Sequence, residues 1–130
     1  MGHRFLLLSH TGRRSGLRRE TVLEVMEYRR QAREAVVMSG FGRNSDWLLN
    51  VEAKPDEEVE LGGECFPAAH RFLDEEEAVR VLKGYEKRNW MVAPIVRRVL
   101  SWLLGWTYHG SEEDRQRVVE QLPLVAFRPR

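Results

Sequence analysis

The sequence predicts one α+β domain over residues 1–130, built around a small, mostly antiparallel β-barrel or sheet. Three observations predict this class. Short runs of β-forming residues fill much of the first 72 positions, helical periodicity dominates residues 75–121, and an apolar run returns at residues 124–127. With 42% hydrophobic and 32% charged residues, the composition is that of a globular protein large enough to bury a core.

The N-terminal third predicts a meander of three strands. Residues 5–9 form a short apolar run bounded by a turn signal, residues 21–28 partly alternate and are rich in β-formers, and residues 35–39 form a third apolar run. Short polar or glycine-bearing links join them. Consecutive strands with such short connections are expected to pair with one another.

A hairpin is predicted around Gly62-Gly63, with strands at residues 58–61 and 64–66. The second strand is expected to resume over residues 68–72. Pro67 interrupts it, and proline cannot donate a ladder hydrogen bond, so this strand is predicted to lie at an edge or to carry a bulge.

The helices are predicted from caps and 3.6-residue periodicity. A short helix begins after Asn44 or Ser45 and ends before Pro55, and Asp74 caps a longer one. Pro94 stands where a helix tolerates proline, in its first turn. The three longer helices are expected at residues 75–87, 95–106 and 112–121.

The net charge is only +1, but it is unevenly distributed. Residues 1–43 hold nine Lys/Arg and four Asp/Glu, residues 44–80 hold three and eleven, and residues 81–110 hold five and one. A nucleic-acid-binding protein usually carries a large basic excess. A local basic site on a near-neutral chain favours a small anionic ligand, and no nucleic-acid partner is expected.

The single cysteine excludes an internal disulfide, and no Cys/His cluster has zinc spacing, so no metal site is expected. The apolar run near the start is too short for a secretory segment. A cytoplasmic protein is the expectation.

One stretch between the first two predicted strands carries most of the chemistry. It reads His10-Thr11-Gly12-Arg13-Arg14-Ser15-Gly16-Leu17-Arg18-Arg19. Glycine permits positive φ and close approach of backbone amides, and arginine offers a permanent charge with a planar fork of donors. The stretch predicts an anion-binding turn. A solvated cluster of arginines at a hairpin tip is the alternative.

This turn, together with later blocks, resembles the deazaflavin-dependent nitroreductase family of the split β-barrel flavin-binding superfamily. The matching blocks are Leu6-Leu7-Leu8, Thr11 to Gly16 with Arg19, Val36 to Gly40, Asn44 to Asn50, Pro55, Glu58-Val59, Gly62-Gly63 and Leu122 to Phe127. The resemblance implies a split β-barrel of about six strands with flanking helices. It also implies an oxidoreductase that passes a hydride from reduced coenzyme F-420, a deazaflavin with a phosphate and an oligoglutamate tail, to a small electron-poor acceptor such as a quinone, an enone or a nitro compound.

The resemblance also implies a set of cofactor-binding residues. They are Thr11, Gly12, Arg13, Arg14, Ser15, Gly16, Arg19, Ser39, Gly40, Asn44 and Trp47. The arginines, Ser15 and the Gly16 amide would hold phosphate or tail, while Ser39 and Gly40 would lie along the deazaflavin. Trp47 could equally belong to the core. Two alternatives stay open: an FMN-dependent relative, and a non-catalytic carrier of a flavin, haem or fatty acid.

Three features depart from the family pattern or add to it. Relatives commonly have a helix before the first strand, and a partner subunit in a homodimer could supply the missing wall. The Trp-rich segment 88–106 allows three interpretations: a core helix, a substrate lid or dimer surface, and peripheral membrane contact. Tyr108 lies where the family places a tyrosine near the substrate, so it is the predicted proton donor.

Overall fold

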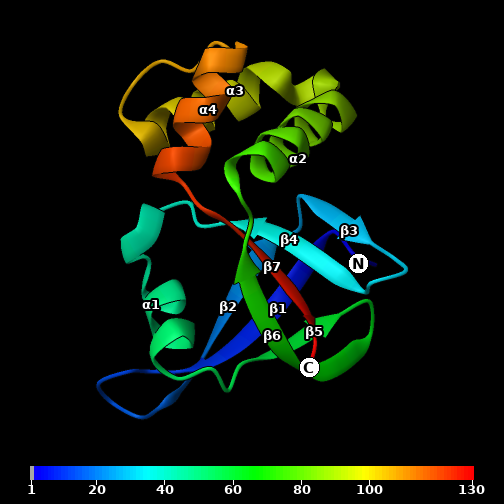
Figure 1. Cartoon of the computed structure of the whole chain (residues 1–130), viewed down its shortest axis with the longest axis vertical. Coiled ribbons are helices and arrows are strands. Elements are labelled where there is room, and N and C mark those ends of the chain that lie inside the picture. Colours follow the sequence, from blue (N-terminus) through cyan, green and yellow to red (C-terminus); the bar gives the residue numbers. More distant parts are fainter. Residues whose placement is uncertain (1) are drawn as a thin grey trace.

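A seven-stranded antiparallel sheet runs through the structure, a computed structural model that describes residues 2–130 (Figure 1). Its strand order is β2-β1-β5-β6-β7-β4-β3, and the sheet is curved but not closed. The strands are β1 (Phe5–Thr11), β2 (Arg18–Glu24), β3 (Glu27–Arg29), β4 (Glu34–Met38), β5 (Glu58–Leu61), β6 (Glu64–Phe72) and β7 (Leu124–Pro129). The predicted α+β split barrel is confirmed, with seven strands rather than about six.

The additional strand arises because the predicted strand at residues 21–28 is bent. β2 pairs with β1, whereas β3 pairs with β4. At the bend, the Val25 amide donates to the Arg4 carbonyl and the Met26 amide to the Val36 carbonyl, each at 2.8 Å. Both side chains are buried there. The chain thus passes from one half of the split barrel to the other within two residues.

β6 makes the same transition at Pro67, and the predicted edge position is wrong. Residues 64–67 of β6 pair with β5, and residues 68–72 pair with β7. Pro67 stands where the neighbour changes, and its carbonyl accepts from the Arg130 amide at 2.8 Å. The interior strand accommodates proline here because the backbone hydrogen bonds at this point use the Pro67 carbonyl and the Ala68 amide, which donates to the Glu57 carbonyl at 3.0 Å, and need no amide from Pro67.

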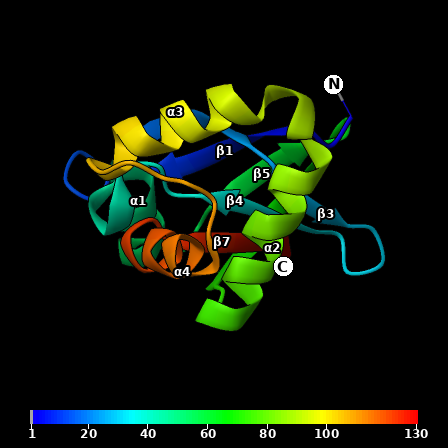
Figure 2. The ribbon, with the colours of Figure 1, turned by 90° about the horizontal axis from the view of Figure 1, so that it is seen from above.

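The helices divide into two groups (Figure 1). The helical segments are η1 (Gly42–Asn44), α1 (Asp46–Ala53), α2 (Glu75–Arg88), η2 (Trp90–Val92), α3 (Ala93–Leu104) and α4 (Glu112–Gln121). α1 lies beside the barrel, on the same side as the β1–β2 hairpin loop. The other helices form a layer over one end, and Figure 2 shows α3 on one side of it, α4 opposite and α2 joining them.

Two apolar cores hold these layers together. The first fills the barrel, between the inward face of the strands and α1, and includes Leu6, Leu8 and Phe127. The second lies between the outer face of the sheet and α2, α3 and α4, and includes Val36 and Leu82. Fully burying one such side chain contributes about 1.5–3 kcal/mol.

An ion-pair cluster attaches the first turn of α2 to the sheet. Arg71 of β6 and Arg29 of β3 both contact the carboxylates of Glu34 and Glu77, at 2.7–3.0 Å. Asp74 caps the helix by accepting from the Glu77 amide at 2.8 Å. Arg71 and Arg29 lower the pKa of Glu77 to about 2, more than burial raises it.

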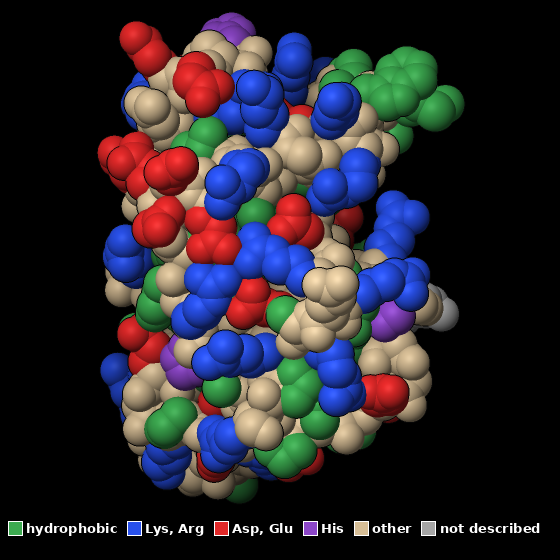
Figure 3. Space-filling view, turned by 45° about the vertical axis from the view of Figure 1, so that its right-hand side comes forward, with side chains coloured by type: hydrophobic (Ala, Val, Ile, Leu, Met, Phe, Trp, Pro, Cys, Tyr) green, Lys and Arg blue, Asp and Glu red, His purple; other side chains and the backbone are tan. Residues whose placement is uncertain are grey.

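The Trp-rich segment is only partly a core helix. Leu100 and Leu104 of α3 are buried, whereas the outer face of η2 and α3 stays exposed. That apolar face consists of Trp90, Met91, Val92, Ile95, Val99 and Trp102. Figure 3 shows hydrophobic side chains gathered at one corner of the helical layer, above a face where acidic and basic groups are mixed. Among residues 2–130, no helix has the length and apolarity needed to cross a bilayer.

Candidate functional site

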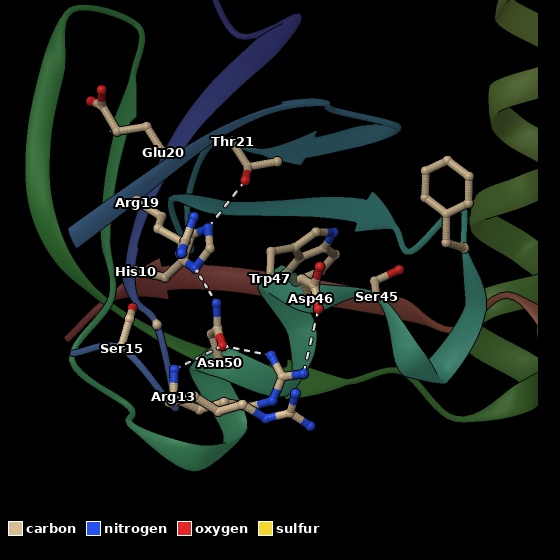
Figure 4. A pocket seen from close by; sticks show the side chains of 13 residues that line it. His10, Arg13, Ser15, Arg19, Glu20, Thr21, Ser45, Asp46, Trp47 and Asn50 are labelled. Carbon is tan, nitrogen blue, oxygen red and sulfur yellow. Dashed lines mark hydrogen bonds and ion pairs between the residues drawn. The ribbon is translucent and has the colours of Figure 1, made fainter. Parts of the chain in front are cut away.

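A pocket of about 550 Å³ opens between the β1–β2 hairpin, the β4–α1 loop and the first turn of α1 (Figure 4). Its volume is typical of small-ligand sites. The lining residues are His10, Gly12, Arg13, Arg14, Ser15, Arg19, Glu20, Thr21, Phe41, Ser45, Asp46, Trp47 and Asn50. We call it the cationic pocket, because three arginines line it.

The hairpin turn is closed by its own backbone. The Gly12 amide donates to the Leu17 carbonyl at 2.8 Å, and the Gly16 amide donates to the Gly12 carbonyl at 2.9 Å. Gly16 has φ +72°, which favours glycine. A Cβ at Gly12 would lie 2.5 Å from Ser15 Oγ and 3.2 Å from Arg19 Nε, so both side chains would have to move to admit it. The side chains of Ser15 and Arg19 therefore pack directly over the backbone of Gly12.

Asn50, buried on α1, attaches this turn to the helix. Its Oδ1 accepts from the Arg13 amide at 3.0 Å and from Arg13 Nη1 at 2.8 Å. Arg13 Nη2 also lies 3.4 Å from Asp46 Oδ1 in the first turn of α1. Figure 4 shows the Arg13 guanidinium turned toward these two residues. Arg13 is thus held by the protein itself.

The same Asn50 carboxamide determines which ring nitrogen of His10 carries the proton. Because Oδ1 faces Arg13, Nδ2 is the atom 3.1 Å from His10 Nδ1, which must accept. The ring proton then lies on Nε2, 3.1 Å from Thr21 Oγ1. Burial, followed by the charges of Arg18 and Arg19, lowers the pKa of His10. His10 is a neutral, fixed wall of the pocket near pH 7.

Arg14 and Arg19 are different from Arg13. Both are exposed at the pocket and neither has an ion-pair or hydrogen-bond partner among residues 2–130. The backbone amides of Arg14 and Ser15 also lack an acceptor in this part of the chain. Glu20 lines the same pocket, but Figure 4 shows its side chain directed away from His10 and Asn50. The guanidinium groups of Arg14 and Arg19 are donors that a multiply charged anion could use, as are the two amides.

Arg18 faces a different set of groups, although it belongs to the same hairpin. Its Nη1 contacts Thr11 Oγ1 at 3.0 Å and Asp56 Oδ1 at 3.2 Å, and its Nη2 contacts Glu58 Oε1 at 3.2 Å. Thr11 donates to Asp56 Oδ2 at 2.8 Å. This hydrogen bond and the Arg18 charge lower the pKa of Asp56. Arg18 and Thr11 stabilise the hairpin rather than line the pocket.

The β4–α1 loop forms the opposite wall. The Ser39 and Ser45 hydroxyls lie 2.6 Å apart, and both reach the Gly42 carbonyl, at 2.6 and 3.2 Å. This arrangement leaves Phe41 76% exposed at the pocket. Trp47 belongs to the hydrophobic core and also lines the pocket. Its side chain is 7% exposed, and its ring centroid lies 6.0 Å from that of Phe127. Two aromatic side chains therefore line the same pocket as the three arginines.

The structure brings together six of the residues predicted to bind the cofactor. Gly12, Arg13, Arg14, Ser15, Arg19 and Trp47 line the pocket. Five others do not line it: Thr11, Gly16, Ser39, Gly40 and Asn44. The amide predicted for phosphate, that of Gly16, already donates within the turn. Ser39 is fully buried beneath the loop, Asn44 is exposed on η1, and Gly40 lines a separate apolar groove.

Tyr108, the predicted proton donor, lies in the helical layer. Its side chain is 2% exposed and its hydroxyl donates to Glu86 Oε1 at 2.6 Å. The other Glu86 oxygen accepts from Arg115 Nε at 2.7 Å. Burial and Glu86 raise the pKa of Tyr108. The structure therefore places this hydroxyl in a link between α2 and α4, away from the residues that line the cationic pocket.

Seven lining residues are not in the predicted cofactor-binding set: His10, Glu20, Thr21, Phe41, Ser45, Asp46 and Asn50. The signal for His10 was the alternation of β1, in which Leu6, Leu8 and His10 share the inward face. Asn50 falls one turn after Trp47 on the buried face of α1, where a polar residue needs a partner. No local pattern marks Phe41, because its exposure depends on the conformation of the whole loop.

The profile of the F-420H(2)-dependent quinone reductase family matches residues 1–93, so the chain belongs to that family of oxidoreductases. The matched part contains every residue of the cationic pocket. Comparison with curated proteins found no match.

Solved structures of similar fold agree with the split barrel. One is an F-420-H2 dependent reductase, 18% identical, with a TM-score of 0.53, covering 98% of this chain and 96% of that one. Another is described as a domain-swapped dimer, 18% identical, with a TM-score of 0.59, covering 98% and 81%. A third is a pyridoxamine 5'-phosphate oxidase-related, FMN-binding protein from Nostoc punctiforme, 13% identical, with a TM-score of 0.51, covering 97% and 70%. At these identities the likeness establishes the fold.

Proposed function

We propose that the cationic pocket binds coenzyme F-420 and that the chain reduces a quinone with it. The observation that carries the proposal is the pair of guanidinium groups of Arg14 and Arg19, which have no partner among residues 2–130 and line a pocket that also has aromatic walls. F-420 combines a polyanionic tail with a flat ring. The donor set fits that combination, because arginine binds phosphate and carboxylate while aromatic side chains accept a ring face.

In this proposal, the residues of the chain bind the cofactor, orient it and shield it from water. Arg14, Arg19 and the free amides of the turn would hold phosphate or tail, and Phe41 and Trp47 would border the ring. When bound, the reduced deazaflavin supplies the hydride. Neutral His10 donates to Thr21 and accepts from Asn50, so it positions the wall of the pocket instead of transferring a proton near pH 7.

The quinone is the acceptor favoured by the family to which the chain belongs. Enones and nitro compounds are electron-poor in the same sense, and the proposal extends to both. The neighbour described as a domain-swapped dimer supports an assembly of two copies. The FMN-binding neighbour supports FMN as the alternative cofactor.

A cofactor titration tests the proposal before any acceptor is chosen. F-420 and FMN are titrated separately, with protein fluorescence as the readout, at two salt concentrations. We expect tighter binding of F-420, weakened by salt because several charges pair. Reduced F-420 is then mixed with a quinone, an enone and a nitro compound, and steady oxidation with the quinone is expected. Tighter binding of FMN would contradict the cofactor assignment, and tight F-420 binding without turnover would indicate a carrier.

A further inference from the structure

A second pocket, of about 410 Å³, lies in the helical layer, where α2 continues through η2 into α3 (Figure 2). We call it the α2–α3 pocket. Its lining residues are Lys83, Glu86, Lys87, Asn89, Trp90, Ala93, Val96, Arg97 and Arg115. None of them lines the cationic pocket. The volume is within the range of small-ligand sites.

One acid lines this pocket, and its charge is compensated inside the protein. One oxygen of Glu86 accepts from the Tyr108 hydroxyl at 2.6 Å, and the other accepts from Arg115 Nε at 2.7 Å. The side chains of Glu86 and Arg115 are both largely buried. An anion that enters the pocket therefore meets no uncompensated negative charge.

Three cations of the lining have no partner. Lys83 and Lys87 lie one turn apart on α2, and Arg97 lies on α3; within residues 2–130 their side chains make no hydrogen bond or ion pair. The dipole of α2 favours a basic residue in its last turn, which explains Lys87 but not Arg97. Residues 87–111 contain no Asp or Glu. Cations from two helices that line one pocket without a neutralising acid favour an anionic ligand.

An aromatic ring and a free acceptor complete the lining. Trp90 of η2 is 70% exposed, and within residues 2–130 its ring has no aromatic or cation–π partner. Asn89 donates through Nδ2 to the Tyr85 carbonyl at 2.8 Å, so its Oδ1 is left without a donor in this part of the chain. Ala93 and Val96 add apolar surface. An exposed indole accepts a flat ring, and the cations beside it accept a phosphate.

We propose that the α2–α3 pocket binds a phosphorylated compound with a flat ring, of about the size of a nucleoside monophosphate. The phosphate contacts Lys83, Lys87 and Arg97, and the ring lies on Trp90. A single carboxylate would leave part of this charge unpaired, so three cations favour a dianion. The pocket shares no residue with the cationic pocket, so this inference does not depend on the assignment of F-420.

The four tryptophans separate this site from the rest of the protein. Trp90 lines the α2–α3 pocket, Trp47 lines the cationic pocket, Trp102 is exposed on α3, and Trp106 donates to Gln121. Protein labelled with 15N is titrated with adenosine monophosphate (AMP), and the indole signals are followed by NMR. We expect a saturable shift of Trp90. A Trp90 signal that does not move, or that moves only with the midpoint of Trp47, would overturn the inference.

A charge-removal series tests the phosphate contacts. Lys87→Gln and Arg97→Gln each remove one cation of the lining, whereas Arg98→Gln removes an exposed cation of α3 that does not line the pocket. By calorimetry, we expect the Kd for AMP to rise about three- to tenfold in the first two variants and to stay within about twofold in the third. Tm should change by no more than about 2 °C in all three. Equal changes of Kd in all three, or a fall in Tm with unchanged Kd, would overturn the inference.

A third comparison tests the ring and the source of the phosphate. Trp90→Ala should weaken AMP about tenfold and leave inorganic phosphate within about twofold, because only AMP has a base to stack on the indole. Adenosine, which lacks the phosphate, should bind at least about tenfold more weakly than AMP to the wild-type protein. Equal affinity for AMP and inorganic phosphate would overturn the inference. So would vesicles of phosphatidylglycerol that shift Trp90 and Trp102 together while AMP shifts neither, because the cations would then face a lipid surface.

Discussion

Replacing Asn50 by alanine should uncouple the β1–β2 hairpin turn from α1. The carboxamide is 2% exposed and makes three hydrogen bonds, two from Arg13 and one to His10, which is itself 3% exposed. Each net hydrogen bond contributes about 0.5–1.5 kcal/mol, and a buried group left without a partner costs more. Their sum is about 2–4 kcal/mol in the free energy of unfolding. For a chain of this length we expect a fall in Tm of roughly 10 °C.

Circular dichroism during heating measures this change, and Asn44→Ala is the matched control. Asn44 is exposed on η1 and makes no side-chain hydrogen bond within residues 2–130. Its replacement is expected to shift Tm by no more than about 2 °C, as at an ordinary surface position. A shift of Asn50→Ala no larger than that of Asn44→Ala would refute the role assigned to the carboxamide.

A carboxylate at the same position tests the His10 tautomer. Asn50→Asp keeps an acceptor for Arg13 but presents oxygen to His10 Nδ1, which can bond only if it is protonated. The pKa of His10, lowered by burial in the wild-type protein, is expected to rise above its ordinary value. An NMR titration of the imidazole reports it. A pKa that does not rise would contradict the tautomer.

Three further substitutions test the structure, two in the hairpin turn and one in the ion-pair cluster of α2. Gly12→Ala brings a Cβ within 2.5 Å of Ser15 Oγ and 3.2 Å of Arg19 Nε, so we expect F-420 affinity, measured by calorimetry, to fall about three- to tenfold at nearly unchanged Tm. Gly16→Ala should lower the free energy of unfolding by about 1 kcal/mol, because the residue has φ +72°. It should leave F-420 affinity unchanged, because the added Cβ would have no neighbour within 4 Å. A loss of stability in Gly12→Ala together with a loss of affinity in Gly16→Ala would contradict the roles assigned to these glycines. The stability from Glu77, whose pKa is lowered to about 2, is present above its ordinary value of 4.5 and is lost as pH falls toward 2. In urea unfolding, Glu77→Gln should therefore lose less stability between pH 5 and pH 3 than the wild-type protein does. Equal losses in the two proteins would contradict the role assigned to Glu77 in the ion-pair cluster.

Much of the fold could be predicted because local patterns agree with it. α4 begins and ends where its cap and charge pattern place it, and α1 follows Ser45 as expected. The bends at Val25-Met26 and at Pro67 could not be predicted in this way, because each marks a change of neighbouring strand. Which strands pair depends on the whole sheet, so it cannot be predicted from hydrophobic alternation or from the β-propensity of one segment.

In the candidate site, residues of one contiguous motif could be predicted, whereas residues that depend on loop conformation or on distant contacts could not. The hairpin that carries Arg14 and Arg19 is a contiguous motif, so its chemistry can be inferred from the sequence alone. The assignments on the β4–α1 loop depended on which face of the loop meets the pocket, and there Phe41 is exposed while Ser39 is buried. His10 joins the pocket through a hydrogen bond to Asn50, forty positions away in the sequence. Such partners become visible only when the fold brings them together.

The most direct test of the account compares three arginines of one hairpin. Arg14→Ala and Arg19→Ala remove unpaired charges from the cationic pocket, whereas Arg18→Ala removes the same charge from a cluster with Asp56 and Glu58. For each variant, the Kd for F-420 and the Tm are measured together. We predict that the first two raise Kd by about tenfold or more at unchanged Tm, while Arg18→Ala lowers Tm and leaves Kd within about twofold. Equal losses of affinity in all three variants, or a loss of Tm with unchanged affinity for Arg14→Ala and Arg19→Ala, would contradict the account.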